Sequence, residues 1–189
     1  MNEIDLQDSM CDLLRDIFAG YQLLNKGGNL QEIQIFAQYV PQPAGVTIHA
    51  RENTGLKNYT DTDYESNFPC IVVILNECED KEERRIDASL VKMTLLFCVY
   101  DDAPECQGYR DLLNMQERVR NYLLVNRIVN NRFRLEMPVK TRLIPCETWP
   151  VYFGEMDLIF QSGRPSMPKS FVFEHNPINN LSNMAAHSV

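Results

Sequence analysis

The stretch Phe68-Pro69-Cys70-Ile71-Val72-Val73-Ile74-Leu75 decides the fold that we predict for this chain. Its side chains are apolar on both alternating faces, so we expect a central strand that is covered on both sides. From this strand to Gln161 the sequence predicts a charged loop, a strand, a turn, a helix and two further strands. The fold class that follows is α+β, an antiparallel β-sheet meander with two helices packed on it.

Three later strands are expected from the alternation of apolar and polar side chains. The clearest lies at residues 88–100, and residues 132–143 alternate strictly. In the second of these strands Pro138 faces the charged side and lacks a backbone donor, which predicts an edge strand or a bulge. The last core strand turns five residues inward: Tyr152, Gly154, Met156, Leu158 and Phe160.

Two helices are predicted from apolar residues at three- and four-residue steps. The first covers residues 4–24, and we expect Asn25-Lys26-Gly27-Gly28-Asn29 to end it, with glycine in the left-handed conformation. The second covers residues 109–127. A half-buried strand at residues 33–39 follows the first helix, and residues 46–51 are expected to form another short strand.

Two polar segments have alternative interpretations. The loop at residues 52–67 is long enough for a binding or docking role, and a solvated excursion explains it equally well. Residues 76–85 carry nine polar or charged side chains around Cys78 and predict a charged hairpin loop. This loop is either a solvated tip or an electrostatic contact with a partner.

The pattern of core residues ends at Ser162. We therefore predict one domain at residues 1–161 and an extended C-terminal arm at residues 162–189. Three prolines break any helix in the arm, four asparagines add polarity, and only Phe171-Val172-Phe173 is strongly apolar. This short run could add as a strand to another sheet, most simply that of a neighbouring subunit.

The composition excludes several classes of protein. The 189 residues carry a formal charge of −8, and an acidic chain without a basic stripe is poorly suited to wrapping nucleic acid. The N-terminus does not resemble a secretory signal, and no stretch approaches the length of a membrane helix. We expect a protein that is made in a reducing cytoplasm, with no membrane partner. The six cysteines form no Cys-x-x-Cys pair and are expected to be free thiols.

No catalytic constellation is recognisable. Asp101-Asp102 could suggest a metal site or an acid–base pair, but the two carboxylates stand where turn and helix-start residues belong. The three histidines, His49, His175 and His187, are scattered, and no phosphate-binding, nucleophile-elbow or zinc motif is present. We therefore expect no enzyme activity, no cofactor and no metal, and a protein that works through its surfaces.

The candidate contact residues fall into three groups. The charged hairpin loop, the cationic face of residues 132–142 and the apolar run of the arm are the surfaces expected to meet a partner or another subunit. A cationic sheet edge is also the usual protection against unwanted strand addition. The candidates are Glu77, Glu82, Glu83, Arg84, Arg85, Arg132, Arg134, Lys140, Arg142, Phe171 and Phe173.

The order of elements at about residues 4–161 resembles the tail terminator (tail completion) proteins of long-tailed bacteriophages and related small neck and tail proteins. Five segments carry the resemblance: Phe68-Pro69-Cys70-Ile71-Val72-Val73, Val99-Tyr100-Asp101, Gln107-Gly108-Tyr109 with Leu112-Leu113-Asn114, Glu117-Arg118-Val119-Arg120 with Leu123-Leu124, and Pro150-Val151-Tyr152-Phe153-Gly154-Glu155-Met156. The arm beyond Ser162 lies outside the common pattern.

The resemblance implies a virion protein at the head–tail joint. Such a protein forms a ring, commonly a hexamer, that ends tail-tube polymerisation and meets the tail tube protein on one side and the head connector or stopper protein on the other. DNA passes through the ring as cargo, which suits an acidic subunit. Two alternatives remain open: another neck or tail structural protein, such as a head-completion protein or adaptor, and a transient tail-assembly factor.

Overall fold

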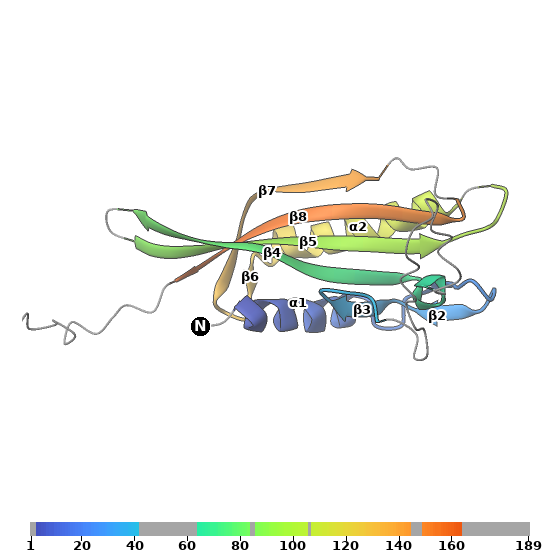
Figure 1. Cartoon of the computed structure of the whole chain (residues 1–189), viewed down its shortest axis with the longest axis horizontal. Coiled ribbons are helices and arrows are strands. Elements are labelled where there is room, and N and C mark those ends of the chain that lie inside the picture. The colour runs from blue at the N-terminus through green and yellow to red at the C-terminus, as the bar shows by residue number, and fades with distance from the viewer. Residues whose placement is uncertain (1–2, 42–63, 84–85, 106, 145–148, 164–189) are drawn as a thin grey trace, which may run out of the picture.

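The computed structural model describes residues 3–41, 64–83, 86–105, 107–144 and 149–163, and shows an α+β fold with two helices on one face of a six-stranded sheet (Figure 1). The predicted strand at residues 46–51, most of the polar loop and the apolar run of the arm lie outside these ranges. The elements in chain order are α1 (Glu3–Ile17), β1 (Gln22–Leu24), β2 (Leu30–Glu32), β3 (Gln34–Ala37), the 3-10 helix η1 (Tyr64–Asn67), β4 (Cys70–Glu83), β5 (Ile86–Tyr100), α2 (Gly108–Val125), β6 (Ile128–Val129), β7 (Phe133–Leu143) and β8 (Val151–Gly163).

The strand order corrects the predicted antiparallel meander at two points. The sheet runs β3-β4-β5-β8-β7-β6, so β8 lies between β5 and β7, and β3 is parallel to β4 whereas the other neighbours are antiparallel. The chain crosses from β5 to β7 through α2. A helix is about 10 Å wide, which is roughly twice the spacing between neighbouring strands. The crossing by α2 therefore leaves room for one strand between β5 and β7, and β8 occupies it.

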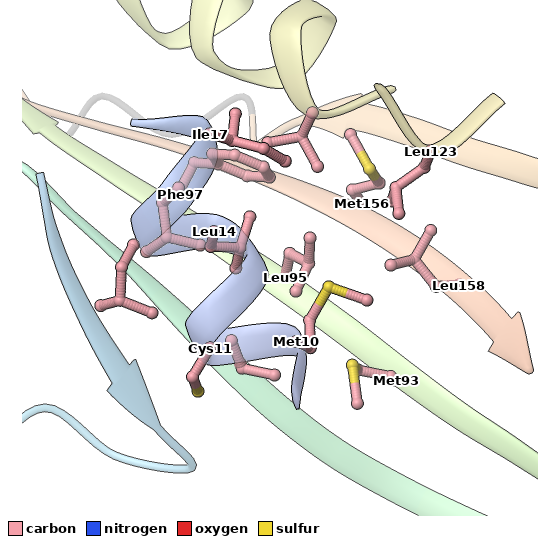
Figure 2. Packing of buried hydrophobic residues seen from close by; sticks show 14 of the residues in the cluster. Met10, Cys11, Leu14, Ile17, Met93, Leu95, Phe97, Leu123, Met156 and Leu158 are labelled. Carbon is pink, nitrogen blue, oxygen red and sulfur yellow. The ribbon is translucent and has the colours of Figure 1, made fainter. Parts of the chain in front are cut away.

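The main core lies between the two helices and one face of the sheet (Figure 2). Met10 and Leu14 of α1 and Leu123 of α2 pack against Leu95 of β5 and Met156 of β8, and each is fully buried. The predicted inward faces of β5 and β8 are confirmed, because their alternate residues from Val91 to Val99 and from Met156 to Phe160 are at most 2% exposed: Val91, Met93, Leu95, Phe97, Val99, Met156, Leu158 and Phe160.

A second, smaller core covers the opposite face at one end of the sheet. It contains Phe68, Cys70, Val72, Cys98 and Val151, all buried. Ile71 and Val73 meanwhile belong to the helix-side core. The start of β4 is therefore buried on both faces, which confirms the interpretation of the apolar stretch as a doubly covered strand.

The first helix is shorter than predicted. It ends at Ile17, and Gly20, three residues later, takes a left-handed φ of 73°. Arg118 of α2 donates to the carbonyl oxygen of Ile17 at 2.9 Å, which satisfies one of the exposed acceptors at a helix end. The predicted stop at residues 25–29 is instead the turn between β1 and β2, where Asn25 Oδ1 accepts hydrogen bonds from the backbone of Gly27 and Asn29.

The predicted strand at residues 33–39 is also shorter. Ile33 and Ile35 are buried as expected, but β3 ends at Ala37, and Tyr39 is 78% exposed. Gln38 explains the end, because its φ of 66° is incompatible with an extended strand.

Ser162 and Gly163 belong to β8 and not to an arm. Ser162 is 3% exposed and lies opposite Ser89 of β5. The folded domain therefore extends at least to Gly163, two residues beyond the predicted boundary.

Candidate interaction surfaces

The most prominent surface is a long hairpin made by the end of β4 and the start of β5. The two strands stay paired from the body of the sheet to Glu83 opposite Ile86, and β8 accompanies them as far as Gly163 opposite Ala88. Figure 1 shows this hairpin projecting beyond the part of the sheet that the helices cover. We call residues 76–92 the projecting ribbon.

The ribbon corrects the predicted charged loop at residues 76–85. Residues 76–83 are strand, and the register places Glu82 opposite Asp87. The sequence did not predict this strand, because Glu77, Cys78 and Glu79 are all exposed and no alternation of buried apolar residues marks the segment. Arg84 and Arg85 lie outside the described residues, as do the side chains of Glu82 and Glu83.

One ion pair crosses the base of the ribbon. Lys92 Nζ lies 2.8 Å from Glu77 Oε2, and the two residues are partners across β4 and β5. The hydrogen bond to Glu77 raises the pKa of Lys92. Glu77 is therefore engaged within its own hairpin, while the register of β4 shifts beside it, between Leu75 and Glu77.

The predicted cationic face lies on β7 and on the residue before it. Arg132, Arg134, Lys140 and Arg142 are all exposed. Arg142 differs from the others in binding two carboxylates, those of Glu155 and Asp157 on β8. Arg134 makes one looser ion pair, with its Nε 3.7 Å from Oε1 of Glu136. The charge of Arg142 is compensated within the subunit, which leaves Arg132, Arg134 and Lys140 as the better candidates for a contact with another molecule.

A row of polar side chains crosses the middle of the sheet on the face away from the helices. Asn76 donates to Thr94 Oγ1 at 2.7 Å, and Thr94 donates to Asp157 at 2.8 Å. Asp157 then accepts from Arg142 at 3.1 Å. Four neighbouring strands are thereby linked by side chains as well as by their backbones.

Most of β7 forms an open edge of the sheet. β6 pairs only with Phe133 and Arg134, and no other strand among the described residues lies against the outer side of residues 136–143. The register breaks between Glu136 and Lys140, around Pro138, so the predicted bulge is confirmed. Met137 and Leu143 are 50% and 40% exposed on this edge. Unpaired backbone groups beside exposed apolar side chains suit contact with another chain.

A groove of about 370 Å³ separates the middle of α1 from the end of α2 and from β6. Asp12 and Asp16 stand on one wall, and Tyr122 and Ile128 add apolar surface. Asp12 already pairs with Arg15 at 2.6 Å. The sequence did not predict this groove, because its two walls come from segments that are more than 100 residues apart. The local pattern that could have pointed to it is the pair of aspartates, Asp12 and Asp16, one helical turn apart.

The side chain of Asp101 binds the backbone at the start of α2. Its carboxylate accepts hydrogen bonds from the backbone of Ala103 at 3.0 Å and of Gly108. The interpretation of Asp101 as a turn and helix-start residue is confirmed. Within the described ranges no group of three or more histidine, cysteine, aspartate or glutamate side chains is placed to hold a metal ion. The three histidines lie outside those ranges.

Four cysteines are described, and all are free thiols, as predicted. Cys11, Cys70 and Cys98 are buried, whereas Cys78 is exposed on the ribbon. Cys106 and Cys146 lie outside the described residues. Neither of the described helices is long and apolar enough to cross a membrane.

No protein-family model matches the chain, and no curated protein matches it significantly. The resemblance to tail terminators therefore remains a prediction that rests on the residues quoted above.

Proposed function

We propose that this chain is a structural virion protein that forms a ring at the head-proximal end of a phage tail, ends tail-tube polymerisation and joins the tail to the head connector. The projecting ribbon is the observation that carries the proposal. An isolated two-stranded hairpin is marginally stable in water, and this one is held by continuing the strands of a packed sheet. Such a ribbon presents a contact at a fixed distance from the body.

The open edge of β7 supplies a second surface that ring formation needs. A closed ring requires two different patches on each subunit, one for each neighbour. The ribbon and the β7 edge are different patches of one sheet. The start of β4 in this sheet is buried on both faces. In the proposed ring Arg132, Arg134 and Lys140 meet an acidic surface of the neighbour.

The charge of the chain supports the proposed place in the particle. At −8 the subunit repels DNA phosphates, so a lumen lined by several copies lets DNA slide without binding. Catalysis has no part in the proposed function, and neither does a cofactor.

Native mass spectrometry and electron microscopy of the purified full chain test the proposal. We expect a closed ring, most simply a hexamer, that binds the ends of tail tubes. A phage lacking the protein should make tubes of uncontrolled length. The double charge reversal Arg84→Glu with Arg85→Glu should weaken ring formation or tube binding, and Arg15→Glu on α1 serves as the matched control. A strictly monomeric protein that ignores tail tubes would contradict the proposal.

Mass spectrometry of purified virions separates the two alternatives from the terminator. A transient assembly factor is absent from the finished particle. A head-completion protein or adaptor is present, but it remains with the heads when heads and tails are separated, and tube length stays normal without it.

A further inference from the structure

Two buried cysteines lie side by side in the centre of the sheet. Cys70 of β4 and Cys98 of β5 are direct partners in the antiparallel register. They are 0% and 2% exposed and belong to the smaller core, on the face away from the helices. Residues directly opposite in antiparallel strands project to the same face, so the two thiols share one apolar environment.

Their backbone spacing matches that of a disulfide. Antiparallel partners have Cα atoms about 4.5–5.5 Å apart, and disulfides join residues whose Cα atoms are about 4.4–6.8 Å apart. A hydrogen bond with the Cys70 thiol, together with burial, raises the pKa of Cys98 well above its usual value. The two thiols are therefore cross-strand neighbours on one buried face of the sheet, at a backbone spacing that a disulfide can bridge.

We propose that Cys70 and Cys98 form a dithiol modification site, which a small-molecule disulfide converts into a cross-strand disulfide between β4 and β5. One cysteine attacks a sulfur of the reagent, forming a mixed disulfide and releasing one small thiol. The second cysteine then displaces the other small thiol. The protein loses two electrons and two protons, and the reagent gains both, so the exchange is balanced.

The pairing is selective because the sheet separates the other described thiols from this site. Cys11 packs in the core on the helix side of the sheet. Cys78 lies on the exposed ribbon, beside the hydroxyl of Ser89 at 3.1 Å. Abundant small thiols drive the exchange backwards, so the site stays reduced where they are abundant and closes only under oxidising conditions. The inference does not depend on the proposed function.

The test uses a variant of the full chain in which Cys78→Ser, Cys106→Ser and Cys146→Ser leave three cysteines. It is incubated with oxidised glutathione at mildly alkaline pH, with and without urea below the unfolding transition. Free thiols are then counted in denaturant, with maleimide labelling and mass spectrometry. We expect the count to fall from three to one, with only Cys11 labelled. The same variant carrying Cys98→Ala should keep both of its thiols.

Peptide mapping of the oxidised wild-type protein without reductant gives a second readout, which needs no substitution. It should yield a linked peptide pair that contains Cys70 and Cys98. Three persistent thiols in the variant, under conditions that modify Cys78 of the wild type, would overturn the proposal. A linked pair that contains Cys11 would overturn it as well.

Discussion

Gly108 starts α2 in a place where a side chain has no room. A Cβ atom there would lie 2.5 Å from Cδ2 of Tyr152 and 2.8 Å from Cβ of Asp101. Its backbone N–H binds Asp101, and Asp101 in turn donates its own backbone N–H to the carbonyl oxygen of Pro150 at 2.8 Å. One residue without a side chain therefore lets the end of β5, the start of α2 and the start of β8 meet.

We predict that Gly108→Ala lowers the free energy of unfolding by about 1–3 kcal/mol, because the methyl group has to displace the Tyr152 ring. Alanine normally stabilises a helix relative to glycine by about 0.5–1 kcal/mol, so a loss reports the steric conflict directly. Urea unfolding followed by circular dichroism measures it, with the exposed Glu117→Ala on the same helix as control. An unchanged or increased stability would show that the three elements do not pack so closely.

Asp111, in the first turn of α2, gives a prediction about pH. Burial, and secondarily the charge of Asp101, raises the pKa of Asp111. An acid whose pKa rises on folding costs stability once it ionises, so this cost appears as the pH rises from the ordinary value through the raised one. We expect Asp111→Asn to gain stability relative to wild type over this window, and the gain to vanish at lower pH.

Urea unfolding of Asp111→Asn and wild type at a series of pH values measures the slope of this difference. Asp16→Asn, on the exposed side of α1, is the matched control for removing one carboxylate. A difference that is constant with pH, or that grows on acidification, would contradict the assignment.

At the scale of elements, the ribbon should be dispensable for folding and required for assembly. We predict that replacing residues 80–89 with Asn-Gly, which suits a tight turn between Glu79 and Leu90, leaves a cooperatively folded monomer, because both main cores lie outside the deleted segment. Ring formation should be lost. Circular dichroism checks the fold and native mass spectrometry checks the assembly; intact rings from this variant would remove the ribbon from the contact.

The elements that the sequence predicted well are those in which burial follows a local period. β5, β8 and α2 each place apolar residues at the expected spacing, and their bounds differ from the prediction by a few residues at most. The ribbon was missed because its residues 77–79 are exposed, so no apolar alternation marks them as strand. The end of α1 was missed because Gly20 and the capping Arg118 set it, and Arg118 is about 100 residues away.

At the scale of the whole molecule, the position of β8 and the groove beside α1 could not be predicted. Both depend on which distant segments become neighbours, and that choice is made by the crossing of α2 over the sheet. Arg134, Lys140 and Arg142 were predicted on the strand that carries them, β7, whereas Glu77, Glu82 and Glu83 were predicted in a loop and belong to β4. The sequence did not predict which of these charged residues form ion pairs within the subunit, as Arg142 and Glu77 do.

The boundary of the arm gives a whole-molecule prediction. Truncation after Gly163 should leave a domain as stable as the full chain, because β8 is then complete, and it should weaken ring or virion assembly. Truncation after Gln161 removes buried Ser162 from its place beside Ser89 and should be measurably less stable. Thermal unfolding of the two truncations, with native mass spectrometry of each, checks both statements. Equal melting of the two would place the true boundary earlier.

The continuity of β5 from the tip of the ribbon to the core also has a mechanical consequence. The strand has 15 residues and spans roughly 50 Å without an interruption, and it is bonded on both sides along most of its length. A force along the strand axis is shared by many backbone hydrogen bonds between β5 and its two neighbours, which are loaded in shear at once. A sideways force instead bends the ribbon about the place where it joins the packed sheet. The subunit is thus stiff toward tension and compliant toward bending, and strain applied at its tip reaches the sheet centre without passing through a hinge.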